Sequence, residues 1–139
     1  MRVIAVSVAL VIAALVLVEA QPRHPVRGRI FAPVMGVGGA GWRGRPEREN
    51  EEAPSKAIDA LDLKPGMVVA DIGAGSGYYA SRIAKRVGPA GRVYATDIQQ
   101  GMIDILERRI KNDGLTNVTT ILGGMDDPRL PPASIDLAI

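Results

Sequence analysis

The chain has 139 residues, of which 47% are hydrophobic and 23% charged, enough for one globular domain and not for two. It contains no cysteine and a single histidine, His24, so disulfides, thiolate metal sites and a cysteine nucleophile are excluded and no metal site is expected. The formal net charge of +2 is too small to indicate binding of nucleic acid.

An apolar run opens the chain. After Arg2, residues 3–18 carry no charge and one polar side chain, Ser7, and the run ends at Val18-Glu19-Ala20. This order is typical of a secretory signal peptide. A helix over the run would reach only ~24 Å, short of the ~30 Å hydrocarbon layer. We therefore expect residues 1–20 to be a signal peptide that exports the protein, for example to a periplasm. An uncleaved membrane anchor through residues 3–18 is the alternative.

A different composition follows the apolar run. Residues 21–50 are rich in proline, glycine and arginine, which interrupt any helical or strand period. We expect a solvated linker here, and a folded domain over residues 51–139.

Helix and strand patterns alternate from Pro54 onward. A first helix is expected with Ala57, Ile58 and Leu61 on one face. The pattern then predicts strands at 67–72, 92–97, 118–122 and from 135, and helices at 78–87 and 101–112. Such alternation predicts an α/β fold, a Rossmann-like parallel sheet with helices on both faces. Ligands of such sheets bind at the carboxyl ends of the strands.

The first strand is followed by a glycine-rich loop, whose expected ligand-binding residues are Gly73, Ala74, Gly75 and Gly77. Glycine lets the backbone adopt positive φ or approach a ligand closely. A dinucleotide-binding loop would need a small residue where this chain has Tyr78, and Asp71 before the loop would repel a pyrophosphate. The same carboxylate favours the cationic amino acid portion of S-adenosylmethionine (SAM). An NAD(P)-binding oxidoreductase is therefore the less favoured alternative.

Asp97 ends the second predicted strand and is followed by Ile98. A carboxylate at this position can accept hydrogen bonds from both ribose hydroxyls of a nucleoside, and the isoleucine would pack against the adenine. The alternative is that Asp97 only caps the next helix.

The third predicted strand is followed by Gly123-Gly124-Met125-Asp126-Asp127-Pro128. A carboxylate here could accept from the adenine amino group, with Met125 giving apolar cover. Asp126 and Asp127 both qualify, and an ordinary Asp-Pro turn is the alternative.

Three segments together resemble one known family. Residues 69–78, 91–98 and 130–137 are similar to the first motif, the second-strand acid motif and the lead into the fourth strand of class I SAM-dependent methyltransferases, in the broad methyltransferase-domain group. The resemblance implies SAM as cofactor and, by its spacing from Leu130, favours Asp126 as the adenine-side acid. It also implies a sheet of seven strands, of which this sequence would hold the first four as a C-terminally truncated domain.

The resemblance leaves the methyl acceptor open. The Gly-Ser-Gly-Tyr stretch is similar to protein isoaspartyl methyltransferases, whereas the Leu-Pro stretch is similar to enzymes of the quinone-biosynthesis type. The acceptor is therefore an unidentified small molecule or protein, and the catalytic residues, expected after the fourth strand, are unknown. We expect a SAM-dependent methyltransferase. A catalytically incomplete nucleoside-binding module is the alternative.

Overall fold

The computed structural model describes residues 26–30 and 34–139 and divides the chain into two units, residues 1–35 and 36–139. The apolar run at 3–18 lies outside the described residues, and none of the helices in 26–30 and 34–139 is long and apolar enough to cross a membrane. In the first unit all seven described residues are exposed. The second unit holds every helix and strand that follows.

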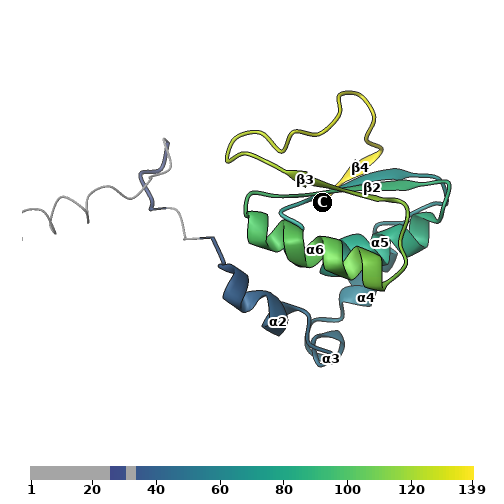
Figure 1. Ribbon diagram of the computed structural model, residues 1–139, viewed down its shortest axis with the longest axis horizontal. Coiled ribbons are helices and arrows are strands. Elements are labelled where there is room, and N and C mark those ends of the chain that lie inside the picture. The colour runs from purple at the N-terminus through teal and green to yellow at the C-terminus, as the bar shows by residue number, and fades with distance from the viewer. Residues whose placement is uncertain (1–25, 31–33) are drawn as a thin grey trace, which may run out of the picture. The chain divides into compact units, whose positions relative to one another are not determined.

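From Pro54 to Leu122 helices and strands alternate, as the sequence predicts (Figure 1). In chain order the elements are the 3₁₀ helix η1 (Val37–Gly39), α2 (Ala40–Arg43), α3 (Arg48–Glu52), α4 (Pro54–Ala60), β1 (Val68–Ile72), α5 (Tyr78–Val87), β2 (Arg92–Asp97), α6 (Gln100–Asn112), β3 (Val118–Leu122) and β4 (Leu137–Ala138). The bounds of α5, β2 and β3 are those expected from the sequence.

The four strands form one parallel sheet in the order β3-β2-β1-β4. Its register aligns Val69 of β1 with Val93 of β2, and Val93 with Val118 of β3. The predicted α/β, Rossmann-like fold class, with a parallel sheet, is confirmed. Because all four strands run in one direction, the loops after β1, β2 and β3 emerge at the same edge of the sheet.

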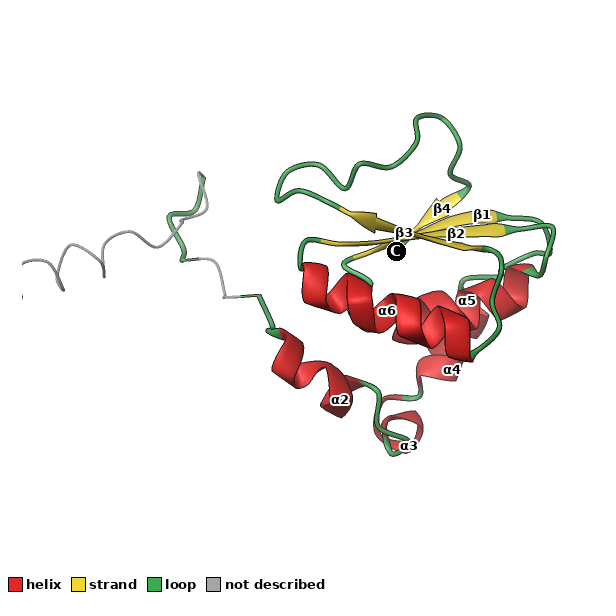
Figure 2. Cartoon of the chain, viewed as in Figure 1, coloured by secondary structure: helices red, strands yellow, loops and turns green. Residues whose placement is uncertain are grey.

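The helices differ from the expectation in one respect. Among the described residues, α4, α5 and α6 lie on one face of the sheet, and the loop 123–136 crosses the other face (Figure 2). The reason is topological. Right-handed connections from β1 to β2 and from β2 to β3 step in the same direction and so place α5 and α6 on the same face. Only the connection to β4 returns past β1, and no helix forms within it.

The core lies between the sheet and these helices. Val69, Val93 and Ala95 meet Ile83 and Leu106, all of them fully buried. The predicted packed face of α6 is confirmed, with Ile103 and Leu106 buried and Ile110 half-buried. Ala57 is exposed, contrary to expectation, because the buried stripe of the short α4 follows Pro54 and Ile58 instead.

Short helices occupy part of the stretch expected to be a linker. In α3, Arg48 forms an ion pair with Glu52 one turn away, and Arg45 just before it pairs with Glu51. The Arg48 guanidinium also lies 4.3 Å from the centroid of the Tyr78 ring. These contacts hold residues 45–52 against the start of α5, where composition alone indicated a solvated chain.

Asn117 joins β3 to the end of α5. Its buried side-chain amide donates to the carbonyl oxygens of Ala84 and Gly88 at 2.9 and 2.8 Å. We expect Asn117→Ala to lower the free energy of unfolding by about 2 kcal/mol, because a buried and a half-buried carbonyl group each lose a donor. Chemical denaturation measures this change. Asn112→Ala, at an exposed position, is the control and should change stability by less than about 0.5 kcal/mol. Equal effects of the two substitutions would contradict the assignment.

Candidate functional site

The loop between β1 and α5 is folded back onto the end of β2. The backbone N–H groups of Gly73 and Ala74 both donate to the carbonyl oxygen of Thr96, at 2.9 and 2.8 Å. Gly73, Gly75 and Gly77 have φ values of 76°, 55° and 77°. These left-handed conformations explain why glycine occupies alternate positions of the loop.

The three glycines of this loop have different surroundings. A Cβ atom added at Gly73 or Gly75 would meet nothing within 4 Å, so the backbone there borders open space. A Cβ atom at Gly77 would lie 2.2 Å from Cδ1 of Leu106. Gly73 and Gly75 thus leave room for a ligand, whereas Gly77 lets α5 pack closely against α6. Ala74 is half-buried and packs against the core.

Asp97 ties this loop to the end of β2. Its Oδ2 accepts from the backbone N–H of Gly75 at 3.0 Å, and its Oδ1 accepts from Gln99 at 2.9 Å. A carboxylate has about four acceptor positions, so two remain after these bonds. The N-cap position of α6 is Gln99 and has no side-chain cap, and the N–H of Met102 donates to the Gln99 carbonyl oxygen. The carboxylate therefore orders the loop and keeps acceptor capacity for a ligand.

Asp71, at the end of β1, is 6% exposed and only half satisfied. It accepts a hydrogen bond from the backbone N–H of Ala80 in the first turn of α5, while its Oδ2 is buried with no partner. Burial raises the pKa of Asp71 to about 6, the Ala80 hydrogen bond opposes this rise, and the nearby charge of Asp97 adds to it. A buried, unpaired carboxylate oxygen next to a second carboxylate favours a cationic group.

Apolar side chains are exposed at the ends of three neighbouring strands. Ile72 after Asp71 is 48% exposed, Ile98 after Asp97 is 37% exposed, and Leu122 at the end of β3 is 38% exposed. Met125, beyond β3, is 82% exposed. An exposed apolar surface beside the carboxylates suits a flat aromatic base. Ile72 and Leu122 were not predicted as site residues, although both lie at the end of a predicted strand.

The loop after β3 begins next to Asp97, because the N–H of Gly123 donates to the Asp97 carbonyl oxygen at 3.0 Å. Asp127 forms the turn that was the alternative for this segment: its Oδ1 accepts from the N–H of Arg129 at 2.7 Å. Within residues 34–139, no hydrogen bond is found to the exposed side chain of Asp126. Asp126 is thus the carboxylate of this pair that is available to a ligand.

Together these contacts place Asp71, the loop glycines, Asp97 and the start of the loop after β3 at one edge of the sheet. SAM fits this donor set: the open space at Gly73 and Gly75 can take a ligand, and the unpaired Asp71 oxygen can take its cationic end. The hydrogen bond from the Gly75 N–H to Asp97 joins the glycine-rich loop to the end of β2. It could not be predicted from the sequence, because every residue except proline has a backbone N–H donor.

The raised pKa of Asp71 predicts a pH-dependent stability. Because its folded-state pKa is about 6 and its ordinary value 3.8, the native state holds the proton more tightly, and stability falls as pH rises from about 4 through 6. The loss amounts to roughly 2–3 kcal/mol at most. Asp71→Asn removes the cost of ionising this buried side chain. We therefore expect the free energy of unfolding of the variant, relative to that of the unmodified chain, to increase from pH 4.5 to pH 7.5 in urea unfolding. A difference that is the same at both pH values would contradict the assignment.

Comparisons with known proteins identify the family and the fold. A family model described as "Methyltransferase domain" matches residues 69–139, which are 71 of the 139 residues. A SAM-dependent methyltransferase structure from Aquifex aeolicus is 30% identical with a TM-score of 0.70, over 75% of this chain and 55% of that one.

Curated relatives belong to more than one type of methyltransferase. The protein-L-isoaspartate O-methyltransferase of Methanothrix thermoacetophila is 38% identical over 47% of this chain and 31% of its own length. The ubiquinone/menaquinone biosynthesis C-methyltransferase of Bordetella parapertussis is 41% identical over 53% of this chain and 28% of its own. The chain thus spans about a third of the length of these relatives. On the match to more than half of its residues, the chain belongs to the methyltransferase-domain family of SAM-dependent enzymes.

Proposed function

We propose that this protein binds SAM at the edge formed by the loops after β1, β2 and β3 and transfers its methyl group to an acceptor. The observation that carries the proposal is the Asp97 carboxylate, which accepts a hydrogen bond from Gly75 and lies near the Asp71 carboxylate, whose Oδ2 is buried without a partner. Two carboxylates and an open glycine turn form a site for a cationic nucleoside, and they disfavour a phosphate.

Each residue has an assigned role in the proposed site. Asp97 accepts from the ribose hydroxyls, and Asp71 favours the cationic amino acid portion. Gly73, Ala74 and Gly75 border this portion with bare backbone, and Gly77 sets the position of the loop by its packing. Ile98 and Met125 cover the adenine, and Asp126 accepts from its amino group.

SAM supplies a methyl group that is already activated by its positive sulfonium sulfur. The chain therefore has to orient the donor, hold an acceptor about 3–3.5 Å from the methyl carbon and exclude water. The residues described above act on the donor side only, and no general base is assigned to them. The acceptor, a small molecule or a protein, stays unidentified.

Calorimetry tests donor binding directly. We expect SAM and S-adenosylhomocysteine to bind the full chain, and NAD⁺ to bind at least tenfold more weakly, since its pyrophosphate would face Asp71. Methyl transfer is then followed with SAM labelled on the methyl group, using isoaspartyl peptides, small phenols and cell extracts as acceptors. A chain that binds NAD⁺ and not SAM would overturn the proposal.

A second candidate is a module that binds a nucleoside without methyl transfer. It is favoured by the position of all the assigned residues on the donor side of the site. Binding of SAM with no label transferred to any of these acceptors would support this candidate. Labelled product would exclude it.

We further propose that residues 1–20 either export the protein as a cleaved signal peptide or attach it to a membrane as an uncleaved anchor through residues 3–18. The support is the sequence pattern alone. Expression of a C-terminally tagged chain, followed by cell fractionation and N-terminal sequencing, separates the outcomes. A new N-terminus near residue 21 indicates cleavage, and an intact N-terminus in the membrane fraction indicates an anchor. An intact soluble cytosolic chain would contradict both.

A further inference from the structure

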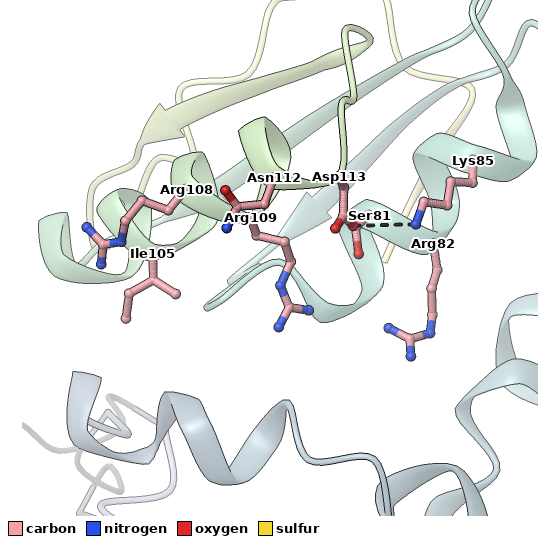
Figure 3. A pocket seen from close by; sticks show the side chains of 8 residues that line it. All are labelled: Ser81, Arg82, Lys85, Ile105, Arg108, Arg109, Asn112 and Asp113. Atoms are coloured by element: carbon pink, nitrogen blue, oxygen red, sulfur yellow. Dashed lines mark hydrogen bonds and ion pairs between the residues drawn. The ribbon is translucent and has the colours of Figure 1, made fainter.

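A basic groove lies on the outer side of α5 and α6, away from the sheet (Figure 3). Its cavity volume is about 660 Å³, within the 300–1,000 Å³ range typical of small-ligand sites. The groove is lined by Ser81, Arg82, Lys85, Ile105, Arg108, Arg109, Asn112 and Asp113. None of these residues belongs to the proposed SAM site at the carboxyl ends of the strands.

The lining of the basic groove carries an excess of positive charge. Four cations and one carboxylate give it a formal charge of +3, although the whole chain has only +2. The single acid, Asp113, is already used by Lys85, with 3.4 Å between Nζ and Oδ2. The small net charge of the whole chain therefore gives no sign of this local concentration of cations.

No carboxylate among residues 26–30 and 34–139 forms an ion pair with any of the three arginines of the groove. The Arg82 guanidinium is held in place by the carbonyl oxygen of Tyr78 at 2.9 Å and by the Tyr78 ring, whose centroid is 3.6 Å away. Gly44, at the end of α2, gives Arg109 room, because a Cβ atom there would lie 3.1 Å from Nη2. Figure 3 shows Arg82 and Arg109 extending to the same side of the two helices.

We propose that the basic groove binds a small polyanion that carries two or three phosphate groups. Guanidinium groups from two neighbouring helices can each donate paired hydrogen bonds to phosphate oxygens, and Lys85 adds a point charge. The bound phosphates would also relieve the repulsion among the cations. A concave groove suits a compact ligand better than the flat surface of a lipid bilayer.

Calorimetric titration of the full chain with tripolyphosphate at low salt tests the proposal. We expect binding that weakens with added salt. The double substitution Arg108→Glu with Arg109→Glu should weaken it at least tenfold, and so should Arg108→Gln with Arg109→Gln, which avoids new acids near α5. The matched control is Lys56→Glu with Lys64→Glu. Both lysines are exposed and lie outside the groove, and the change in charge equals that of the double Arg→Glu variant. SAM binding should be unchanged in all three variants and so confirms their folding.

A short single-stranded RNA in the same titration distinguishes the sources of phosphate. If it binds through the same arginines and more tightly than tripolyphosphate, the groove binds a nucleic acid strand, and the proposal of a small polyanion is overturned. If tripolyphosphate binds as tightly or more tightly, the phosphates belong to a small polyphosphate. Absence of binding by both probes, or equal weakening in the lysine control, would overturn the proposal.

Discussion

Replacing Asp97 with alanine should weaken SAM binding at least tenfold. The carboxylate is expected to accept from two ribose hydroxyls, and hydrogen bonds to a charged group contribute roughly 1.5–3 kcal/mol each. The substitution also removes the acceptor of the Gly75 and Gln99 N–H groups, so the loop that borders the donor loses part of its order. Calorimetry with SAM measures the loss, and denaturation of the same variant measures the structural cost.

Asp104→Ala is the matched control for this variant. Like Asp97→Ala, it removes one negative charge, but from an exposed side chain near the start of α6. The Asp104 carboxylate accepts a hydrogen bond from the Gln100 side-chain amide at 2.8 Å. We expect unchanged SAM affinity. If Asp97→Ala also retained full affinity, Asp97 would have no place in the site.

Gly77→Ala should be the most destabilising substitution in the glycine loop, with a loss of roughly 2–4 kcal/mol in the free energy of unfolding. The new Cβ atom would meet Cδ1 of Leu106 at 2.2 Å, and Leu106 is fully buried and cannot move into solvent. Alanine at φ 77° adds backbone strain. Urea unfolding monitored by circular dichroism measures the change.

Gly73→Ala provides the contrast within the same loop. Its φ of 76° gives a similar strain, but its Cβ atom would meet nothing within 4 Å, so the loss of stability should be only about 1–2 kcal/mol. The new methyl group would instead occupy space assigned to the donor and weaken SAM binding. Equal stability of the two variants would show that contact with Leu106 does not determine the role of Gly77.

The elements around the site could be predicted from sequence because their patterns are local. Val68–Ile72 is an apolar strand with one acid, Asp71, near its end, and Ile103, Leu106 and Ile110 repeat at helical spacing. Strand ends, and with them Asp71 and Asp97, follow directly from such patterns. The short helices at 37–52 could not be predicted in this way, since they depend on contacts such as Arg48 with the Tyr78 ring.

The division of roles within the site also depends on tertiary contacts. From the sequence, Gly73, Gly75 and Gly77 have the same predicted role. Only the position of Leu106 on α6 shows that Gly77 is needed for helix packing, whereas Gly73 and Gly75 border open space. The choice between Asp126 and Asp127 likewise depends on a backbone hydrogen bond to Arg129, which no spacing rule contains. Asp71 was predicted as a charge, while its unpaired, buried oxygen is a property of the fold.

A crystal structure of the full chain with S-adenosylhomocysteine tests the central claim most directly. We predict that the ribose hydroxyls donate to Asp97 and that the amino acid portion lies along Gly73–Gly75 with its ammonium group toward Asp71. A ligand bound elsewhere on the chain, or a ribose with no contact to Asp97, would contradict the account.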